Sequence, residues 1–177
     1  MIESYYWKQD LLAHASRLTP VQRPGRWSER AVVNFEKELM ISFFMIRALL
    51  ERGKVSSRSR KYQVPLGRSP WNGKQITVLN HWLIGDLYRW EDEEASHASI
   101  AFLSNQFVHS RAIFTMRDKT RNWSEVLLCS DFEARKAIYR VSVQEIQKVF
   151  RLVGSDYVRR SSLVYDEELR DYRVTTD

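Results

Sequence analysis

The sequence predicts an α+β fold, with helices in the first part of the chain and strands in the second. Apolar residues up to about residue 110 recur at the 3.6-residue period of helices, whereas later ones alternate as in half-buried strands. We therefore expect an N-terminal bundle of about four helices in residues 1–110. A small, mostly antiparallel sheet with one inserted helix should follow in residues 111–177. A length of 177 residues suits a single domain over 1–177.

The first expected helix covers residues 3–19 and ends at Pro20 and Pro24. Residues 21–27 should form a short connector. The start of the chain lacks a basic region followed by an apolar run, so it does not read as a signal peptide.

The second expected helix covers residues 29–52, with Ser28 as its N-cap and Gly53 at the position where a left-handed glycine ends a helix. Its second half is apolar on nearly every side. A helix of this kind is normally surrounded, so we expect it at the centre of the fold. Its apolar run, residues 39–50, is too short and too polar to span a bilayer, and no membrane association is expected.

The middle of the chain changes character twice. Residues 54–73 are rich in Ser, Arg, Pro and Gly and predict a long loop with a short extended piece at residues 62–66. Apolar residues then return at helical spacing and predict a helix over 74–90. The acidic run at 91–94 would favour the N-terminus of a further helix, over 95–110, through the helix dipole.

The last third of the chain predicts strands. Expected strands cover residues 112–116, 123–129 and 137–141, with a turn at 118–122. Ser142 and Glu145 form a capping box that opens a short helix ending at Gly154. Residues 157–165 and 172–175 predict a final hairpin around an acidic turn.

One short motif resembles a catalytic site. Asn105 and His109 are four residues apart, so both project from one face of the helix that ends there. The string from Ser104 to His109 resembles the motif of HEPN-domain proteins, and the resemblance covers roughly residues 28–110. That family consists of small helical bundles, many of them ribonucleases of bacterial toxin and phage-defence systems.

In the HEPN motif an Arg, often followed by a polar residue, precedes a His by four to six residues. Asn105 and His109 match the last two, but Ser104 occupies the position of the Arg. A metal-independent ribonuclease needs a base of near-neutral pKa and a cation for the phosphorane. Here the cation would have to come from elsewhere, for example Arg111 or the basic loop. The alternative is structural: Asn105 and His109 tie the helix end to nearby backbone.

Charge is strongly segregated along the chain. The net charge is +6, and residues 52–85 contain seven cations but no acidic residue. Two aromatic residues lie among them, and cations with interleaved aromatics are typical of phosphate binding with base stacking. The candidate binding residues are Arg52, Lys54, Arg58, Arg60, Lys61, Arg68, Trp71 and Lys74. The alternative is a solvated loop that contacts acidic residues of this chain or of a protein partner.

Other chemistry is poorly represented. The four histidines lack close cysteine or histidine partners, so we expect no metal site, and the loop from Gly67 to Gly73 lacks the Lys-Ser/Thr ending of a nucleotide-binding loop. No cofactor is therefore expected. Glu133 and Lys136 do not have the spacing of a metal-dependent nuclease core. The lone Cys129 lies in an apolar strand, where a thiol is usually inert, and it fits a reducing cytoplasm.

The sequence thus favours a cytoplasmic, non-catalytic binding or regulatory protein. Its basic loop, residues 52–74, would contact a protein or nucleic-acid partner, and the resemblance suggests a bacterial defence or toxin-type system. One alternative is a HEPN-like ribonuclease that uses Asn105 and His109. A second is a structural subunit whose exposed aromatics are covered in an oligomer.

Overall fold

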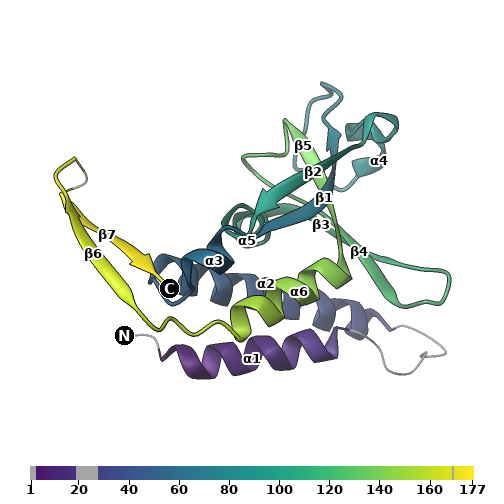
Figure 1. Cartoon of the computed structure of the whole chain (residues 1–177). Coiled ribbons are helices and arrows are strands. Elements are labelled where there is room, and N and C mark those ends of the chain that lie inside the picture. The colour runs from purple at the N-terminus through teal and green to yellow at the C-terminus, as the bar shows by residue number, and fades with distance from the viewer. Residues whose placement is uncertain (1–2, 19–27, 169) are drawn as a thin grey trace.

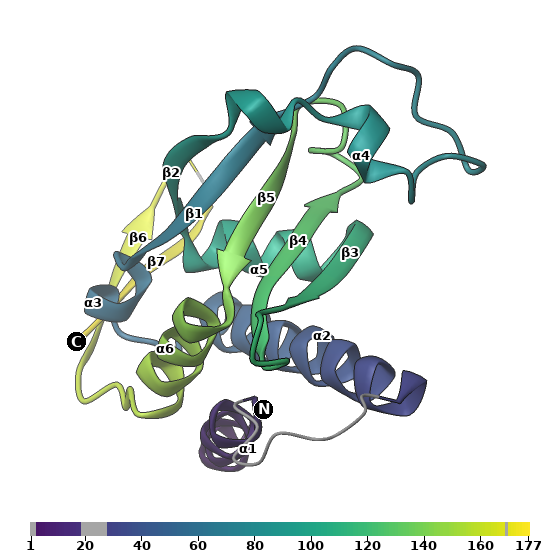
Figure 2. The same cartoon turned by 90° about the vertical axis from the view of Figure 1, so that its right-hand side faces the viewer.

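A five-stranded antiparallel sheet forms the framework of the computed structural model, which describes residues 3–18, 28–168 and 170–177 (Figure 1). The strand order is β2-β1-β5-β4-β3. Helices pack against one face of the sheet, and a separate two-stranded hairpin projects from one end of the molecule (Figures 1 and 2). The predicted α+β class is confirmed. The strands of the sheet are β1 (Gln63–Pro70), β2 (Glu94–Ser99), β3 (Ser110–Arg117), β4 (Trp123–Ser130) and β5 (Ala137–Ser142).

The predicted first two helices and the late helix are confirmed. Ser28 Oγ accepts a hydrogen bond from the N–H of Ala31 at 3.2 Å, and Gly53 has the expected positive φ of 64°. The two prolines and the connector expected after the first helix lie outside the described residues. The helices are α1 (Ser4–Arg17), α2 (Glu29–Glu51), α3 (Ser57–Arg60), α4 (Ile84–Leu87), α5 (Ile100–Val108) and α6 (Val143–Gly154), with a 3-10 turn, η1, at Trp90–Asp92.

The main core lies between the helices and one face of the sheet. Phe43 of α2 is fully buried, with its ring stacked on Phe107 at 4.0 Å and edge-on to Phe150 at 5.3 Å between ring centroids. The expectation that α2 is surrounded on every side is wrong. Met40, Ile41 and Phe44 are 40–56% exposed, because α1, α5, α6 and the sheet leave one side of the helix uncovered.

A second apolar cluster covers the other face of the sheet. It joins Ile76, Leu87 and Tyr88 to β3, β4 and β5, and the Tyr88 hydroxyl donates to the Ala134 carbonyl at 2.9 Å. The predicted helix over 74–90 is wrong, since only α4 is helical there. Asn80 Oδ1 accepts from the N–H of Thr77 at 2.7 Å, so a side chain takes a backbone donor into a turn instead of a helix.

The predicted loop over 54–73 is wrong in part, because β1 runs through it. β1 pairs with β2 over residues 63–68 and with β5 over residues 67–70. Pro65 therefore lies where β1 has a single neighbour, a position that tolerates the missing N–H of proline. The predicted helix over 95–110 starts five residues later than expected, since residues 94–99 form β2.

The acidic run also plays a different role from the one expected. Glu93 accepts from Arg140 at 3.0 Å and from Ser69 at 3.1 Å, so it binds β5 and β1 and does not cap a helix. Because β1 and β2 both come from residues before 111, the division into helices over 1–110 and sheet over 111–177 is wrong. The expected N-terminal bundle of about four helices is not formed within the described residues.

The predicted C-terminal hairpin is confirmed. It consists of β6 (Ser161–Asp166) and β7 (Asp171–Thr176), which we call the arm. Its two ends are joined at the root by the N–H groups of Arg159 and Arg160, which donate to the Asp177 carbonyl at 2.7 and 2.9 Å. Thr176 Oγ1 also donates to the Val55 carbonyl at 2.8 Å. Among the described residues, no helix is long and apolar enough to cross a membrane.

Candidate functional site

The two candidate catalytic residues lie where α5 ends. The N–H of His109 donates to the Asn105 carbonyl at 3.1 Å, and His109 is the C-cap. Its carbonyl accepts from the N–H of Asp131 at 3.2 Å, which links the helix end to the β4–β5 turn. Asn105 and His109 are both exposed and line a hollow of about 300 Å³ together with Arg47 and Glu133.

The His109 ring does not bond to backbone, contrary to the structural expectation. Its Nε2 lies 2.7 Å from Nη1 of Arg47, whose Nε contacts Glu51 at 2.8 Å. Arg47 comes from α2, so the fold places a cation beside His109 that the spacing of the motif does not reveal. Since a guanidinium can only donate, His109 Nε2 accepts, and Arg47 occupies the lone pair that a general base would use.

The first position of the motif faces the core. Ser104 is fully buried, and its hydroxyl donates to the Ile100 carbonyl at 2.8 Å. The next inward residue, Gln106, accepts from the N–H of Ser130 at 2.9 Å and joins α5 to β4. A side chain at position 104 therefore cannot reach the hollow that Asn105 and His109 line.

The carboxylate beside this hollow is an anion. Burial alone would raise the pKa of Glu133, but hydrogen bonds from Lys136 and from the Tyr139 hydroxyl outweigh it, and the pKa is lowered. Burial and the bond to Glu133 raise the pKa of Tyr139. Glu133 is therefore unsuited to act as a general acid near neutral pH.

The basic loop divides between two parts of the molecule. Arg68 belongs to β1 and lies near Glu133 and Tyr139, whereas the Trp71 ring donates to the Lys74 carbonyl at 2.9 Å beside the second apolar cluster. Arg60 has a structural role. Its guanidinium donates to the Val55 carbonyl at 3.0 Å and to the Leu50 carbonyl. The bond to Leu50 caps the C-terminus of α2.

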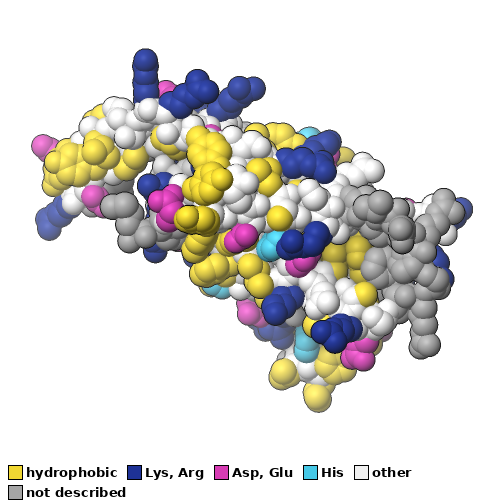
Figure 3. All heavy atoms as spheres, turned by 90° about the horizontal axis from the view of Figure 1, so that it is seen from below, with side chains coloured by type: hydrophobic (Ala, Val, Ile, Leu, Met, Phe, Trp, Pro, Cys, Tyr) yellow, Lys and Arg dark blue, Asp and Glu magenta, His cyan; other side chains and the backbone are white. Residues whose placement is uncertain are grey.

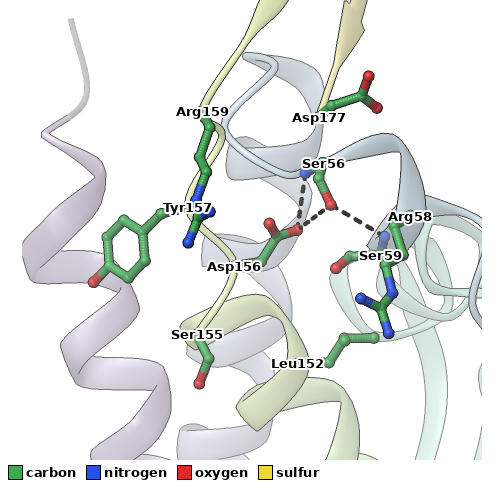
Figure 4. A pocket seen from close by; sticks show the side chains of 9 residues that line it. All are labelled: Ser56, Arg58, Ser59, Leu152, Ser155, Asp156, Tyr157, Arg159 and Asp177. Atoms are coloured by element: carbon green, nitrogen blue, oxygen red, sulfur yellow. Dashed lines mark hydrogen bonds between the residues drawn. The ribbon is translucent and has the colours of Figure 1, made fainter.

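The remaining cations of the loop gather at the root of the arm. Arg58 lines a cavity of about 550 Å³ together with Arg159, which is distant in the sequence (Figure 4). Arg52 and Lys54 line a neighbouring hollow with residues of the arm. We call this region the cationic end, and it comprises Arg52, Lys54, Arg58 and Arg159, together with Lys61 at the end of α3 and Arg160 next to Arg159 in the chain. None of the ion pairs found in the described part of the chain involves these six.

Hydrogen bonds fix the floor of the larger cavity. The N–H and hydroxyl of Ser56 both donate to Asp156 Oδ2, at 2.8 and 2.9 Å, and the N–H of Ser59 donates to the Ser56 hydroxyl at 3.3 Å (Figure 4). Because Asp156 already accepts these bonds, it is held in place beside the two arginines. Tyr157, 45% exposed, adds an aromatic ring at the rim.

Lys8 of α1 binds two backbone carbonyls of the same region. It is 1% exposed, and its ammonium donates to the Lys54 carbonyl at 2.8 Å and to the Asp156 carbonyl. The ammonium also lies 4.6 Å from the Tyr157 ring centroid. Burial lowers the pKa of Lys8. This side chain therefore connects α1 to the segments that carry the cationic end.

Sequence reasoning missed three arginines of these sites. Arg47 lies in the middle of an apolar helix, where nothing local indicates His109 as a neighbour. Arg159 and Arg160 form an Arg-Arg pair, which is a visible signal, but they lie about a hundred residues from the basic loop. The segment after α6 brings them to it, because Asp156 accepts hydrogen bonds from Ser56.

Metal and thiol chemistry find no support in the described residues. They contain no group of three or more His, Cys, Asp or Glu side chains that could hold a metal ion. Cys129 is buried beside Tyr88, and burial raises the pKa of its thiol, which disfavours the reactive thiolate. Comparison of the chain with protein families, curated proteins and solved structures finds no match.

Proposed function

We propose that this chain is a non-catalytic nucleic-acid-binding protein that holds a single strand at its cationic end. One observation carries the proposal. Arg58 and Arg159, from segments about a hundred residues apart, line one cavity of about 550 Å³. Guanidinium groups bind phosphate oxygens with two parallel hydrogen bonds, so two of them at one hollow suit consecutive phosphates.

The surroundings of the cavity support a strand in preference to a single phosphate. Arg52, Lys54 and Arg160 extend the positive charge past the cavity towards the arm. Tyr157 offers an exposed ring, and a ring beside a cationic groove is the usual platform for an unpaired base. A single strand is favoured because its bases are free to stack, whereas those of a duplex are not.

Fluorescence anisotropy with a labelled oligouridine tests the proposal. The probe is titrated at about 50 mM salt with the wild-type protein and with the double variant Arg58→Ala/Arg159→Ala. We expect the double variant to bind roughly tenfold more weakly, because two phosphate contacts are lost. Lys119→Ala/Arg135→Ala is the matched control, since both cations are exposed residues of turns between strands of the sheet and their loss changes the net charge by the same amount.

Two results would overturn the proposal. One is the absence of binding by the wild type at this salt concentration. The other is equal weakening of oligouridine binding by the double variant and by the control that removes two cations elsewhere. That result would show that net charge alone explains the weaker binding. If the wild type binds no nucleic acid, an acidic protein becomes the alternative partner for the same cations.

A metal-independent ribonuclease is the second candidate function, and the presence of Arg47 in the hollow that Asn105 and His109 line favours it. For His109 to act as a base, the Arg47 guanidinium would have to leave His109 Nε2 and turn to the substrate phosphate. That arginine could supply the charge that the resemblance to HEPN-domain proteins places at position 104. Under our main proposal, the wild type does not cleave RNA. Cleavage that disappears in His109→Ala and in Arg47→Ala, with both variants retaining the wild-type melting temperature, would establish the ribonuclease instead.

We also propose that the protein works in the cytoplasm. Its one cysteine is a buried free thiol, which fits a reducing compartment. A place in a bacterial defence or toxin-type system rests on the same resemblance as the ribonuclease. It is therefore tested by the same cleavage assay.

A further inference from the structure

The arm is amphipathic although it lies outside the core. Leu163 pairs with Val174 and Tyr165 with Tyr172, so these four side chains share one face of the ribbon. They are 52–61% exposed. The other face is mainly polar. A two-stranded hairpin of this kind is marginally stable on its own, so its exposed apolar face indicates a surface that covers it.

A second apolar surface runs along α1 and α2. Val33, Met40 and Phe44 follow one another at helical spacing on the exposed side of α2, with Ile41 beside them. From α1, Tyr6 is 67% exposed and Trp7 lies 6.5 Å from the Phe44 ring centroid. We call the five residues Tyr6, Val33, Met40, Ile41 and Phe44 the helical stripe.

The two surfaces are placed to meet only between two copies of the chain. The arm and α1 extend from the root of the arm in opposite directions (Figure 1). Hydrophobic side chains gather on both when the molecule is viewed from below (Figure 3). The arm therefore does not fold back on its own stripe. A two-fold axis lying below the root would place each arm on the helices of the other copy.

The arm is acidic, and cations lie beside the stripe. The arm contains the acids Asp166, Glu167, Glu168 and Asp171 but only two arginines, in a protein whose net charge is +6. The stripe is flanked by the cations Arg30 and Lys37, each next to a glutamate, and both cations are exposed and in no ion pair found among the described residues. The acidic tip of an arm would thus meet cations on the α2 of another copy.

We propose that the protein forms a two-fold dimer in which the apolar face of each arm covers the helical stripe of the partner. The nine side chains of the two surfaces each leave at least two fifths of their area exposed. They offer roughly 600–800 Å² per copy, which is comparable with the ~800 Å² per partner of a standard stable interface. The arm meets the cationic end at its root, where Val174 lines the same hollow as Arg52 and Lys54. The dimer is therefore tested without nucleic acid, so that its failure is distinguishable from a failure of nucleic-acid binding.

Sedimentation velocity and light scattering test the dimer, with the full chain and without nucleic acid. The wild type should have twice the mass of one chain at micromolar concentration. Leu163→Asp on the arm and Phe44→Asp on the stripe should each weaken the dimer, by roughly tenfold or more. Val164→Asp is the matched control, since Val164 lies on the other face of the same strand and is equally exposed, at 61%.

Mixing the two disruptive variants makes the test specific. Leu163→Asp keeps an intact stripe and Phe44→Asp an intact arm, so the mixture retains one of the two arm–stripe contacts. The mixture should therefore form heterodimers where each variant alone is monomeric. Circular dichroism confirms that each variant is folded.

Three outcomes would overturn the proposal. A monomeric wild type would do so directly. Loss of the dimer through Leu163→Asp but not through Phe44→Asp would show that arms pack on arms. Equal disruption by the control Val164→Asp would show that the charge introduced, and not the apolar face, decides association.

Discussion

Phe43 and Phe44 are adjacent on α2 and identical in chemistry, yet they have opposite surroundings. Phe43 is fully buried between Phe107 and Phe150, whereas Phe44 is 56% exposed. Ser104 and Asn105 on α5 differ in the same way, with the first buried and the second exposed. In each pair, the inward residue serves the core and the outward residue is free for a partner or a substrate.

The comparison changes how the apolar and polar motifs of this chain are understood. Hydropathy alone places the whole second half of α2 in the core, and residue spacing alone makes the motif at the end of α5 a single unit. The helical period divides both between two environments. Function in this molecule is therefore to be sought in the outward members, namely the helical stripe, the pair of Asn105 and His109, and the cationic end.

The largest expected effect comes from Ser104→Arg. The serine has no exposed surface and lies between α5 and the sheet, so the substitution would bury an unpaired charge in a filled core. We expect a loss of roughly 3–5 kcal/mol or more in the free energy of unfolding. Urea denaturation checks this, with Asn105→Arg as the neighbouring control. A stable Ser104→Arg variant would contradict the placement of this residue.

Phe43→Ala should have the next largest effect. It removes a ring stacked at 4.0 Å and leaves a cavity, which typically costs about 3–5 kcal/mol. Phe44→Ala should change the free energy of unfolding of the monomer by less than about 1 kcal/mol, because most of this ring is already in water. Chemical denaturation at a dilution where the chain is monomeric compares them. Equal losses would show that the two faces of α2 do not differ as described.

The smallest effect concerns pH and the contact between α1 and α2. His14 Nδ1 lies 2.6 Å from the hydroxyl of the buried Ser42, and burial lowers the pKa of His14 below its ordinary value of 6.5. As the pH falls, His14 therefore takes up a proton at a higher pH in the unfolded chain than in the folded protein. The stabilisation from neutral His14 is complete above pH 6.5 and is lost as the pH drops through the lower folded-state value.

Melting temperatures of the wild type and of His14→Gln, measured from pH 7.5 to 5, check this sign. The stability advantage of the wild type should shrink on acidification, by at most about 1 kcal/mol. A wild-type advantage that grows towards low pH would show that His14 is stabilised in its charged form, contrary to the burial seen here.

Local signals predicted the elements that depend on local chemistry. Caps and glycines gave the ends of α2 and α6, and alternation gave β3, β4, β5 and the arm. The incorrect predictions concern residues 63–99, where residue spacing indicated a loop and helices and did not indicate β1 and β2. There, Pro65 is tolerated only because β1 lacks a second neighbour at that point. Glu93 likewise acts on Arg140, a residue distant in the sequence.

The candidate site was predicted less completely, for the same physical reason. The cations at 52, 54, 58 and 61 were visible as a run, and the structure keeps them together. Arg68 and Lys74 belonged to the same run but lie elsewhere, because β1 carries the chain away from the root of the arm. Arg159 joins the site because Asp156, three residues before it, accepts hydrogen bonds from Ser56, and no periodicity in the sequence encodes that contact.

The salt dependence of nucleic-acid binding tests the central claim most directly. The logarithm of the association constant for oligouridine, plotted against the logarithm of salt concentration, has a slope of about −0.7 for each phosphate neutralised on a single strand. The account predicts that Arg58→Ala/Arg159→Ala makes the slope shallower by about 1.4, while Lys119→Ala/Arg135→Ala leaves it unchanged. An identical slope for the wild type and the double variant would contradict the claim that these two arginines bind phosphates.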